Sequence, residues 1–442
     1  MLTALVIGVL AAGGERPAQS AQSAAVTTAA AQQPATPPQP QGLRFVWNDR
    51  PSLRAGSQFR LDFIGKFQWD SRRAGDDPAD FSAREVHRAR IGVDGEFLDH
   101  FQFQVERELT ERELEGDVEG SRRSEAWKDV YLQIDYTDAA RVRVGKFKIP
   151  FSLDQLTSIS DLDFPYRPLG SSYLAPSRDI GVMVTGRFFD EKLTYAGGVF
   201  RHDGDNARSR NALGADETGA VRVTVAPFRR PGESVLDQLE LGTAFTVSAL
   251  ANDAQLPNGL RGRTLMSRFV FFEPVFVSGR RHRYEIDADW RWERVGARAE
   301  FIESRDSRDG QGILDDDLPP ARARAWYVSG AYVITGEEKN WPVTPRAEVT
   351  RGGQGAVELA ARYERLWFDS AGGTDEPFRH PRAETILPSG NRALTTGVNW
   401  YLNRWVNLQL HAIREELEDP ERNPRADGTP FWSAIFRVNC VL

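Results

Sequence analysis

The chain has 442 residues, a formal net charge of -7 at pH 7 and a mean hydropathy of -0.47, and 27% of its residues are charged. The acidic balance argues against a nucleic-acid-binding protein, since such proteins usually carry a basic excess, and the lone cysteine excludes an intrachain disulfide and a CxxC metal site. Apart from the N-terminal stretch, no run approaches the ~20 apolar residues of a membrane-spanning helix.

The N-terminal region differs in composition from the rest of the chain. Residues 1–25 resemble a signal peptide, with an apolar run over residues 2–12 followed by small residues. No Lys or Arg precedes that run, so we expect the natural start to lie upstream. Residues 26–55 contain AQQPATPPQPQ and are predicted to be a Pro/Gln-rich spacer and N-terminal segment. We expect residues 56–442 to form one β-domain.

The first strong strand pattern covers residues 59–69, FRLDFIGKFQW. Phe59, Phe67 and Trp69 share one parity, whereas Arg60 and Lys66 share the other, and a period of two indicates a β-strand. The run of about ten residues exceeds the ~5–6 of a common soluble strand and suits a tilted strand that crosses a bilayer, at ~9–11 residues. A polar average is compatible with this, because such strands show only alternate residues to lipid.

The same alternation recurs along the chain, at 88–97, 101–108, 129–136, 221–225 and 406–411. The charged residues of each segment share one parity and are predicted to face water, and the apolar residues share the other parity and are predicted to face lipid. The alternative is a large soluble β-protein, in which the apolar face covers a core and the other face meets water.

The connections between the predicted strands fall into a long set and a short set. Long polar segments at 203–219, 305–320 and 368–381 alternate with short turns such as 95–100 and 137–140, as the external loops and periplasmic turns of an outer-membrane barrel do. About 24 residues per strand and connection over ~390 mature residues gives about 16 strands, and an even number is expected. The alternating segment 431–442, FWSAIFRVNCVL, is predicted to be the closing strand. The predicted fold is all-β, a transmembrane antiparallel β-barrel.

Three blocks of sequence resemble the phosphate-selective porin O and P family: HRARIGVDGEF at 87–97, WKDVYLQIDYTDAARVRVGKFKIPFSLDQLTS at 127–158 and RDIGVMVTGRF at 178–188. Segments 325–337 and 355–410 are similar to its C-terminal half. The resemblance implies a trimeric, 16-stranded porin of the bacterial outer membrane that takes up anions passively. It also implies an inward-folded third loop that narrows each pore.

Residues 152–177 are the candidate for that inward loop. Pro150 lacks an amide donor and is expected to help end the preceding strand, and Pro165, Pro168 and Pro176 lie within the segment. The alternative is a long external loop.

An anion-selective pore must replace the water around its ion with several donors and still release the ion. Arg supplies a planar fork and Lys a compact point charge. The candidate pore-lining and anion-binding residues are Arg60, Lys66, Arg88, Arg90, Arg141, Arg143, Lys146, Lys148 and Arg222. Each has an alternative role in a salt-bridged wall network, because Asp62, Asp94, Glu96, Glu106, Glu108, Asp129 and Asp135 share the inferred lumen face.

The sequence contains no GxSxG, P-loop or HExxH motif, and we predict no enzyme activity, no catalytic residues, no metal and no cofactor. The predicted function is diffusion of small anions through the outer membrane, with phosphate the leading substrate. The expected partners are phosphate or other oxyanions, outer-membrane lipid and two further copies of the chain, without nucleic acid. The alternatives are a weakly selective general diffusion porin and a non-porin β-rich binding protein.

Overall fold

The computed structural model describes residues 42–442, apart from 48, 75–80, 111–125, 205–216, 231, 233, 251–256 and 426. The predicted signal peptide and most of the predicted spacer lie outside the described residues. Within the described residues, none of the helices has the length and apolar character that a bilayer crossing requires.

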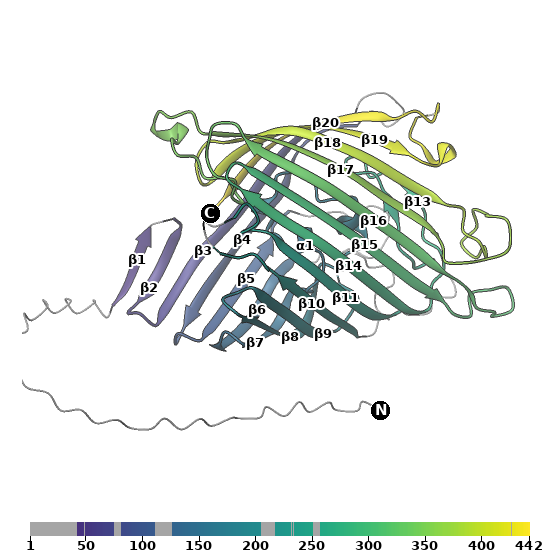
Figure 1. Cartoon of the computed structure of the whole chain (residues 1–442), viewed down its shortest axis with the longest axis horizontal. Helices are drawn as coiled ribbons and strands as arrows, with labels where there is room; N and C mark the ends of the chain where they lie inside the picture. Colours follow the sequence, from purple (N-terminus) through teal and green to yellow (C-terminus); the bar gives the residue numbers. More distant parts are fainter. Residues whose placement is uncertain are drawn as a thin grey trace, which may run out of the picture. The chain divides into compact units, whose positions relative to one another are not determined.

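Sixteen antiparallel strands close into a barrel (Figure 1), which confirms the predicted fold class and strand number. Each strand pairs with the next, and β20 pairs with β3 from Ser433↔Ala74 to Val441↔Lys66. The sixteen strands are β3 (Phe59–Ala74), β4 (Phe81–Phe97), β5 (Phe101–Glu108), β6 (Trp127–Thr137), β7 (Ala140–Lys148), β8 (Arg178–Phe188), β9 (Leu193–Phe200), β10 (Thr218–Val225), β11 (Glu240–Leu250), β14 (Gly279–Trp292), β15 (Val295–Arg308), β16 (Leu318–Val333), β17 (Ala356–Ser370), β18 (Ser389–Tyr401), β19 (Val406–Leu417) and β20 (Phe431–Val441).

The alternation of side chains sets the two faces of this sheet. Apolar residues of one parity, such as Ile91, Val144 and Leu410, are exposed on the outside, while Arg88 and Arg437 of the other parity are buried within the barrel. An apolar outer face of this kind is what contact with lipid requires. The closed barrel also leaves no strand edge unpaired in the bilayer.

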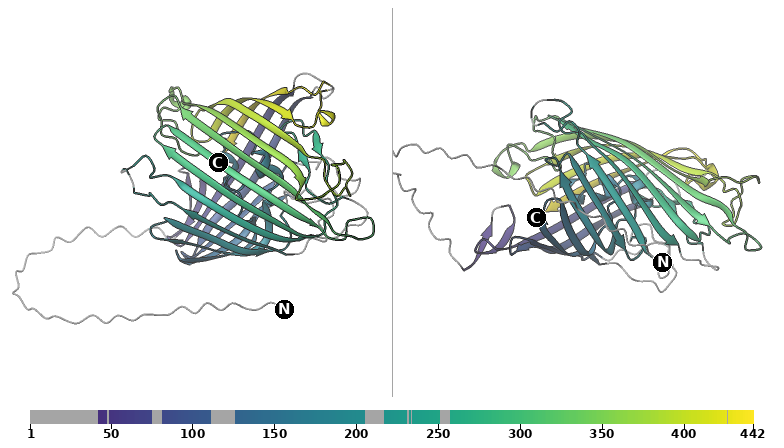
Figure 2. Two further views of the ribbon diagram at one scale, coloured as in Figure 1. Left: turned by 45° about the vertical axis from the view of Figure 1, so that its right-hand side comes forward. Right: turned by 60° about the horizontal axis from the view of Figure 1, so that its bottom comes forward.

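A hairpin precedes the barrel, in a region for which the sequence predicted no strands. β1 (Leu43–Trp47) pairs with β2 (Pro51–Ala55), and β2 pairs with the first residues of β3, from Ala55↔Phe59 to Ser52↔Asp62. It therefore continues the sheet past the point where β20 ends, and it projects beside β3 (Figure 2).

Short elements lie in the connections. They are α1 (Leu153–Leu156), η1 (Ile159–Asp161), α2 (Leu169–Tyr173), β12 (Gly262–Arg263), β13 (Val270–Phe272), η3 (Val349–Arg351) and η4 (Pro420–Arg422). The largest buried apolar cluster joins α2, β13 and inward residues of the wall, among them Leu169, Phe271, Leu366 and Ile413. Part of the barrel interior is therefore a packed core.

Candidate pore and anion-binding site

The segment 152–177 crosses the barrel interior and binds the opposite wall, as predicted for the inward loop. The Leu169 amide donates to Glu364 Oε2 at 2.5 Å, and the Ser171 hydroxyl donates to Glu300 Oε2 at 3.0 Å. Arg362 donates to the Tyr166 carbonyl at 2.9 Å. These partners lie on β15 and β17, so the loop spans the lumen from its origin at β7.

A second inward segment, 257–278, was not predicted from the sequence. Its Leu265 amide donates to Glu415 Oε1 on β19 at 2.9 Å, and the Tyr173 hydroxyl of the crossing loop donates to the Thr264 carbonyl at 3.2 Å. Phe271 and Val277 are buried in the apolar cluster. The two segments share this apolar cluster with inward residues of the wall, which include Phe147 of β7 and Met183 of β8 as well as Ile413 of β19, so together they close part of the lumen.

A third inward segment is the turn 334–355 between β16 and β17. Lys339 Nζ lies 2.5 Å from Asp163 Oδ1 and 2.7 Å from Glu358 Oε2, and the Trp341 indole donates to Asp163 Oδ2 at 3.0 Å. The turn thus holds the middle of the crossing loop. No local feature of residues 334–355 in the sequence indicated that this turn enters the lumen.

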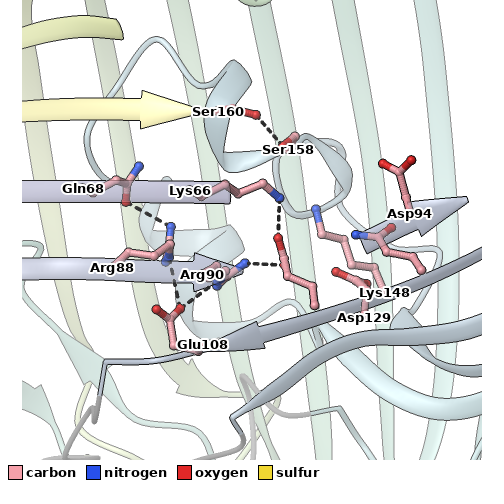
Figure 3. A network of polar contacts seen from close by, with 12 residues as sticks. Lys66, Gln68, Arg88, Arg90, Asp94, Glu108, Asp129, Lys148, Ser158 and Ser160 are labelled. Atoms are coloured by element: carbon pink, nitrogen blue, oxygen red, sulfur yellow. Dashed lines mark hydrogen bonds and ion pairs between the residues drawn. The ribbon is translucent and has the colours of Figure 1, made fainter. Parts of the chain in front are cut away.

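Lys66 of β3 and Arg88 and Arg90 of β4 meet on the wall that faces the crossing loop (Figure 3). Lys66 Nζ lies 2.7 Å from Glu106 Oε1, and Arg90 Nε lies 2.7 Å from Glu108 Oε2. Arg88 donates to Gln68 Oε1 at 3.2 Å and has Glu108 at 3.5 Å. These three cations are therefore brought together, but each is paired with a carboxylate.

Two predicted cations of β7 lack such a pairing. Lys148, the last residue of the strand, donates to the carbonyls of Leu156 and Thr157 at 3.1 and 3.0 Å. Arg143 donates to Gln133 Oε1 at 3.0 and 2.6 Å, and its guanidinium lies 4.2 Å from the Tyr131 ring centroid. Among the described residues, neither makes an ion pair with a carboxylate.

Two arginines that the sequence analysis did not select complete the cluster. Arg167 of the crossing loop lies 2.7 Å from Asp154, and Arg178, at the start of β8, lies 2.7 Å from Asp129. Arg167 lies between Pro165 and Pro168 of the predicted inward loop, and this position could have identified it as a pore-lining candidate. The cluster comprises six cationic residues, Lys66, Arg88, Arg90, Lys148, Arg167 and Arg178, and four acidic ones, Glu106, Glu108, Asp129 and Asp154.

A further carboxyl group, Asp161, adjoins this cluster from η1. Burial raises the pKa of Asp161, and the hydrogen bond with Ser160 and the nearby charges of Lys66 and Lys148 offset only part of the rise. Figure 3 shows Ser158 and Ser160 on the loop, with their hydroxyls joined by a hydrogen bond of 2.7 Å. Ammonium groups and hydroxyl donors together are groups that can replace water around an oxyanion.

The other predicted cations lie apart from this cluster. Arg141 pairs with Asp135 at 2.9 Å near the β6–β7 turn, Arg222 pairs with Glu285 at 2.8 Å and Asp287 at 2.6 Å on the far wall, and Arg60 lies at the start of β3 with Asp62 at 3.5 Å.

Lys146 requires a correction. It pairs in register with Val130 and Ile180, and Ile180 is 49% exposed on the outside of the barrel. Because registered neighbours point to the same face of a sheet, Lys146 lies on the outward face, opposite to Arg143. Lys146 was predicted to line the pore because the strand parity was not followed through Gly145.

Among the described residues, no group of three or more His, Cys, Asp or Glu side chains is arranged to hold a metal ion.

The model of one protein family, phosphate-selective porin O and P, matches residues 54–433. No curated protein matches the chain.

Solved structures of several porins share the fold. The anion-selective porin from Comamonas acidovorans is 10% identical with a TM-score of 0.53, over 87% of this chain and 100% of that chain. The trimer form of OmpT from Vibrio cholerae is 11% identical with a TM-score of 0.51, over 87% and 100%. The outer membrane channel DcaP of Acinetobacter baumannii is 11% identical with a TM-score of 0.51, over 88% and 99%. At these identities the likeness concerns the fold.

Proposed function

The chain belongs to the phosphate-selective porin O and P family and is a porin of the bacterial outer membrane, and from this premise we propose that it passes small anions, with phosphate the leading substrate. The solute moves down its own gradient through the passage between the crossing loop and the β3–β8 wall. The protein acts as a channel and performs no chemistry on the solute.

The surplus of positive charge beside the crossing loop is the observation that carries this proposal. Six cationic and four acidic side chains meet there and a fifth acidic one, Asp161, adjoins them. Lys148 has carbonyl oxygens rather than a carboxylate as its partners. Arg143, also without an ion pair, lies two inward positions before Phe147 on the same strand. A passing anion stabilises these cations, whereas a passing cation is repelled by them.

The ion pairs of the wall have a second consequence. Lys66 and Arg90 are held by Glu106 and Glu108, and a cation that already has a partner attracts an anion less strongly. Conduction requires binding that is weak enough for release. We therefore assign the strongest contact with the anion to Lys148 and Arg143, and weaker contacts to Lys66 and Arg90.

The proposed assembly is a homotrimer in outer-membrane lipid. The trimer form of OmpT, which shares the fold, supports the assembly, and the apolar outer face of the strands supports the lipid contact.

The test is conductance in planar lipid bilayers with a salt gradient. If anions pass preferentially, the reversal potential should have the sign of the equilibrium potential of chloride. If the channel is specific for phosphate, added phosphate should reduce the chloride current. A reversal potential near zero would favour the second candidate, a weakly selective diffusion porin. The acidic side chains of Glu106, Glu108 and Asp129, which lie on the same wall as the cations, support this candidate.

A further inference from the structure

The hairpin that precedes the barrel places three arginines in one row. Arg44 pairs in register with Arg54, and Arg54 pairs with Arg60. Registered residues point to the same face, and Arg60 shares the inward parity of β3 with Asp62, which is buried. The row therefore lies on the face of the sheet that continues the lumen wall.

Such a row costs stability unless a negative charge meets it. Like charges directly opposite one another on neighbouring strands repel. Arg60 has Asp62 at 3.5 Å and Glu96 at 3.7 Å, but within the part of the chain that the structure describes neither Arg44 nor Arg54 has an ion pair. The positive charge of these two side chains is therefore left for an anion from outside the chain.

The barrel fixes the position of the hairpin. Arg50 donates to Asp94 Oδ2 on β4 at 2.9 Å, and the Trp405 indole donates to the Asp49 carbonyl at 2.8 Å. Arg404 also pairs with Asp49. Since residues 402–405 form a short turn, the row lies at the turn end of the barrel, which is the expected periplasmic end.

We propose that Arg44, Arg54 and Arg60 form a second anion-binding site, at the periplasmic mouth of the pore, for phosphate groups. This inference rests on the proposed function in so far as the ligand reaches the row through the pore. Neighbouring strands are ~4.8 Å apart, so the three strands span about 10 Å, and linked phosphates fit this row better than a single one. Lys66 is the sixth residue after Arg60 on β3, which puts the row about 20 Å along the strand from the loop cluster.

The test uses wild-type channels inserted in one orientation in a bilayer, with tripolyphosphate as the probe. Added at the turn end, tripolyphosphate should reduce the chloride current, and in the double variant Arg44→Gln/Arg54→Gln the half-blocking concentration should rise about tenfold or more, because charge-assisted hydrogen bonds are lost. Block from the loop end should be the same in both proteins. Arg351→Gln is the matched control, since Arg351 is a 79% exposed arginine on a connection at the same end. Tripolyphosphate should block this variant at the same concentration as the wild type.

Two sources of phosphate are separated by lipid composition. Equal block in phosphatidylcholine and phosphatidylglycerol bilayers assigns the row to dissolved oxyanions, whereas block that disappears in phosphatidylglycerol assigns it to lipid headgroups. Equal block in the double variant and the wild type, or an equal loss in Arg351→Gln, would overturn the proposed site. The reversal potential of the wild type is measured in the same bilayers, so failure of anion passage is seen separately from failure of this site.

Discussion

Lys339 Nζ lies 2.5 Å from Asp163 Oδ1, although 176 residues separate the two in sequence. The pair joins the β16–β17 turn to the crossing loop in the middle of the barrel. Lys339 is 2% exposed, and its second carboxylate, Glu358, is fully buried. The shape of the passage therefore depends on a contact between segments that enter the barrel from opposite ends.

Replacing Lys339 with Met should destabilise this contact strongly. The change leaves two carboxylates buried without their cation, and breaking a buried pair costs about 3–5 kcal/mol. We expect a corresponding fall in the free energy of unfolding, measured by urea titration of the detergent-solubilised protein, together with greater current noise in single channels. Arg351→Met removes an exposed cation from the same turn and should change the free energy of unfolding by less than about 0.5 kcal/mol. Equal effects of the two substitutions would show that the contact with Asp163 is unimportant.

Lys148 and Lys146 provide a matched pair on one strand. Lys148→Gln removes the ammonium that contacts the crossing loop, so the phosphate concentration that halves the chloride current should rise about tenfold. Lys146→Gln changes a residue on the outward register and should leave that concentration unchanged. The measurement is phosphate titration of chloride conductance. A larger effect at Lys146 would mean that this side chain, rather than Lys148, contacts the passing anion.

Acid should increase anion preference through Asp161. Burial raises the pKa of Asp161 above its usual 3.8, so this carboxyl group takes up a proton at a higher pH than an exposed one and its negative charge disappears from the passage. The folded state binds that proton more tightly than the unfolded state, so lowering the pH also favours folding at this residue.

The corresponding measurement is the reversal potential in a salt gradient between about pH 7 and about pH 4. Asp161→Asn should show the acid value of the anion preference throughout and a weaker dependence on pH. Asp427→Asn, in the exposed loop between β19 and β20, should keep the pH dependence of the wild type. If Asp161→Asn and the wild type respond alike, another group controls the charge of the passage.

Gly170 allows the crossing loop to approach the wall. A Cβ atom at this position would lie 2.7 Å from Ala325 Cβ on β16, which is closer than packed carbon atoms allow. Gly170→Ala should therefore push α2 from the wall and lower the free energy of unfolding by about 1–3 kcal/mol. Gly219→Ala on β10, where the nearest atom is 3.6 Å away, should have little effect in the same urea titration. An unchanged stability of Gly170→Ala would mean that the loop does not pack against β16.

The barrel could be predicted because it follows from local patterns. The parity of Phe59, Phe63 and Phe67 determines which face of β3 meets lipid, and the chain length divided by about 24 residues per strand and connection gives the strand number. The inward loop was predicted correctly from family resemblance and from Pro150. The inward segments 257–278 and 334–355 were missed, because residues such as Leu265 and Trp341 carry no local sign of whether their connection enters the lumen.

The site was harder to predict than the fold. Parity placed Lys66, Arg88 and Arg90 on the inner wall, but it does not identify the partner of each cation. Arg222, for example, is paired with Glu285, which lies 63 residues away. The distinction between paired cations and Lys148 or Arg143 depends on which strands the closed barrel brings side by side.

Conductance of the wild-type protein in planar bilayers, with phosphate titrated against a chloride gradient, tests the central claim most directly. An apolar outer face and a basic passage predict discrete conductance steps, a reversal potential set by chloride and a chloride current that falls as phosphate is added. A bilayer that stays silent, or channels whose reversal potential is set by the cation, would contradict the account.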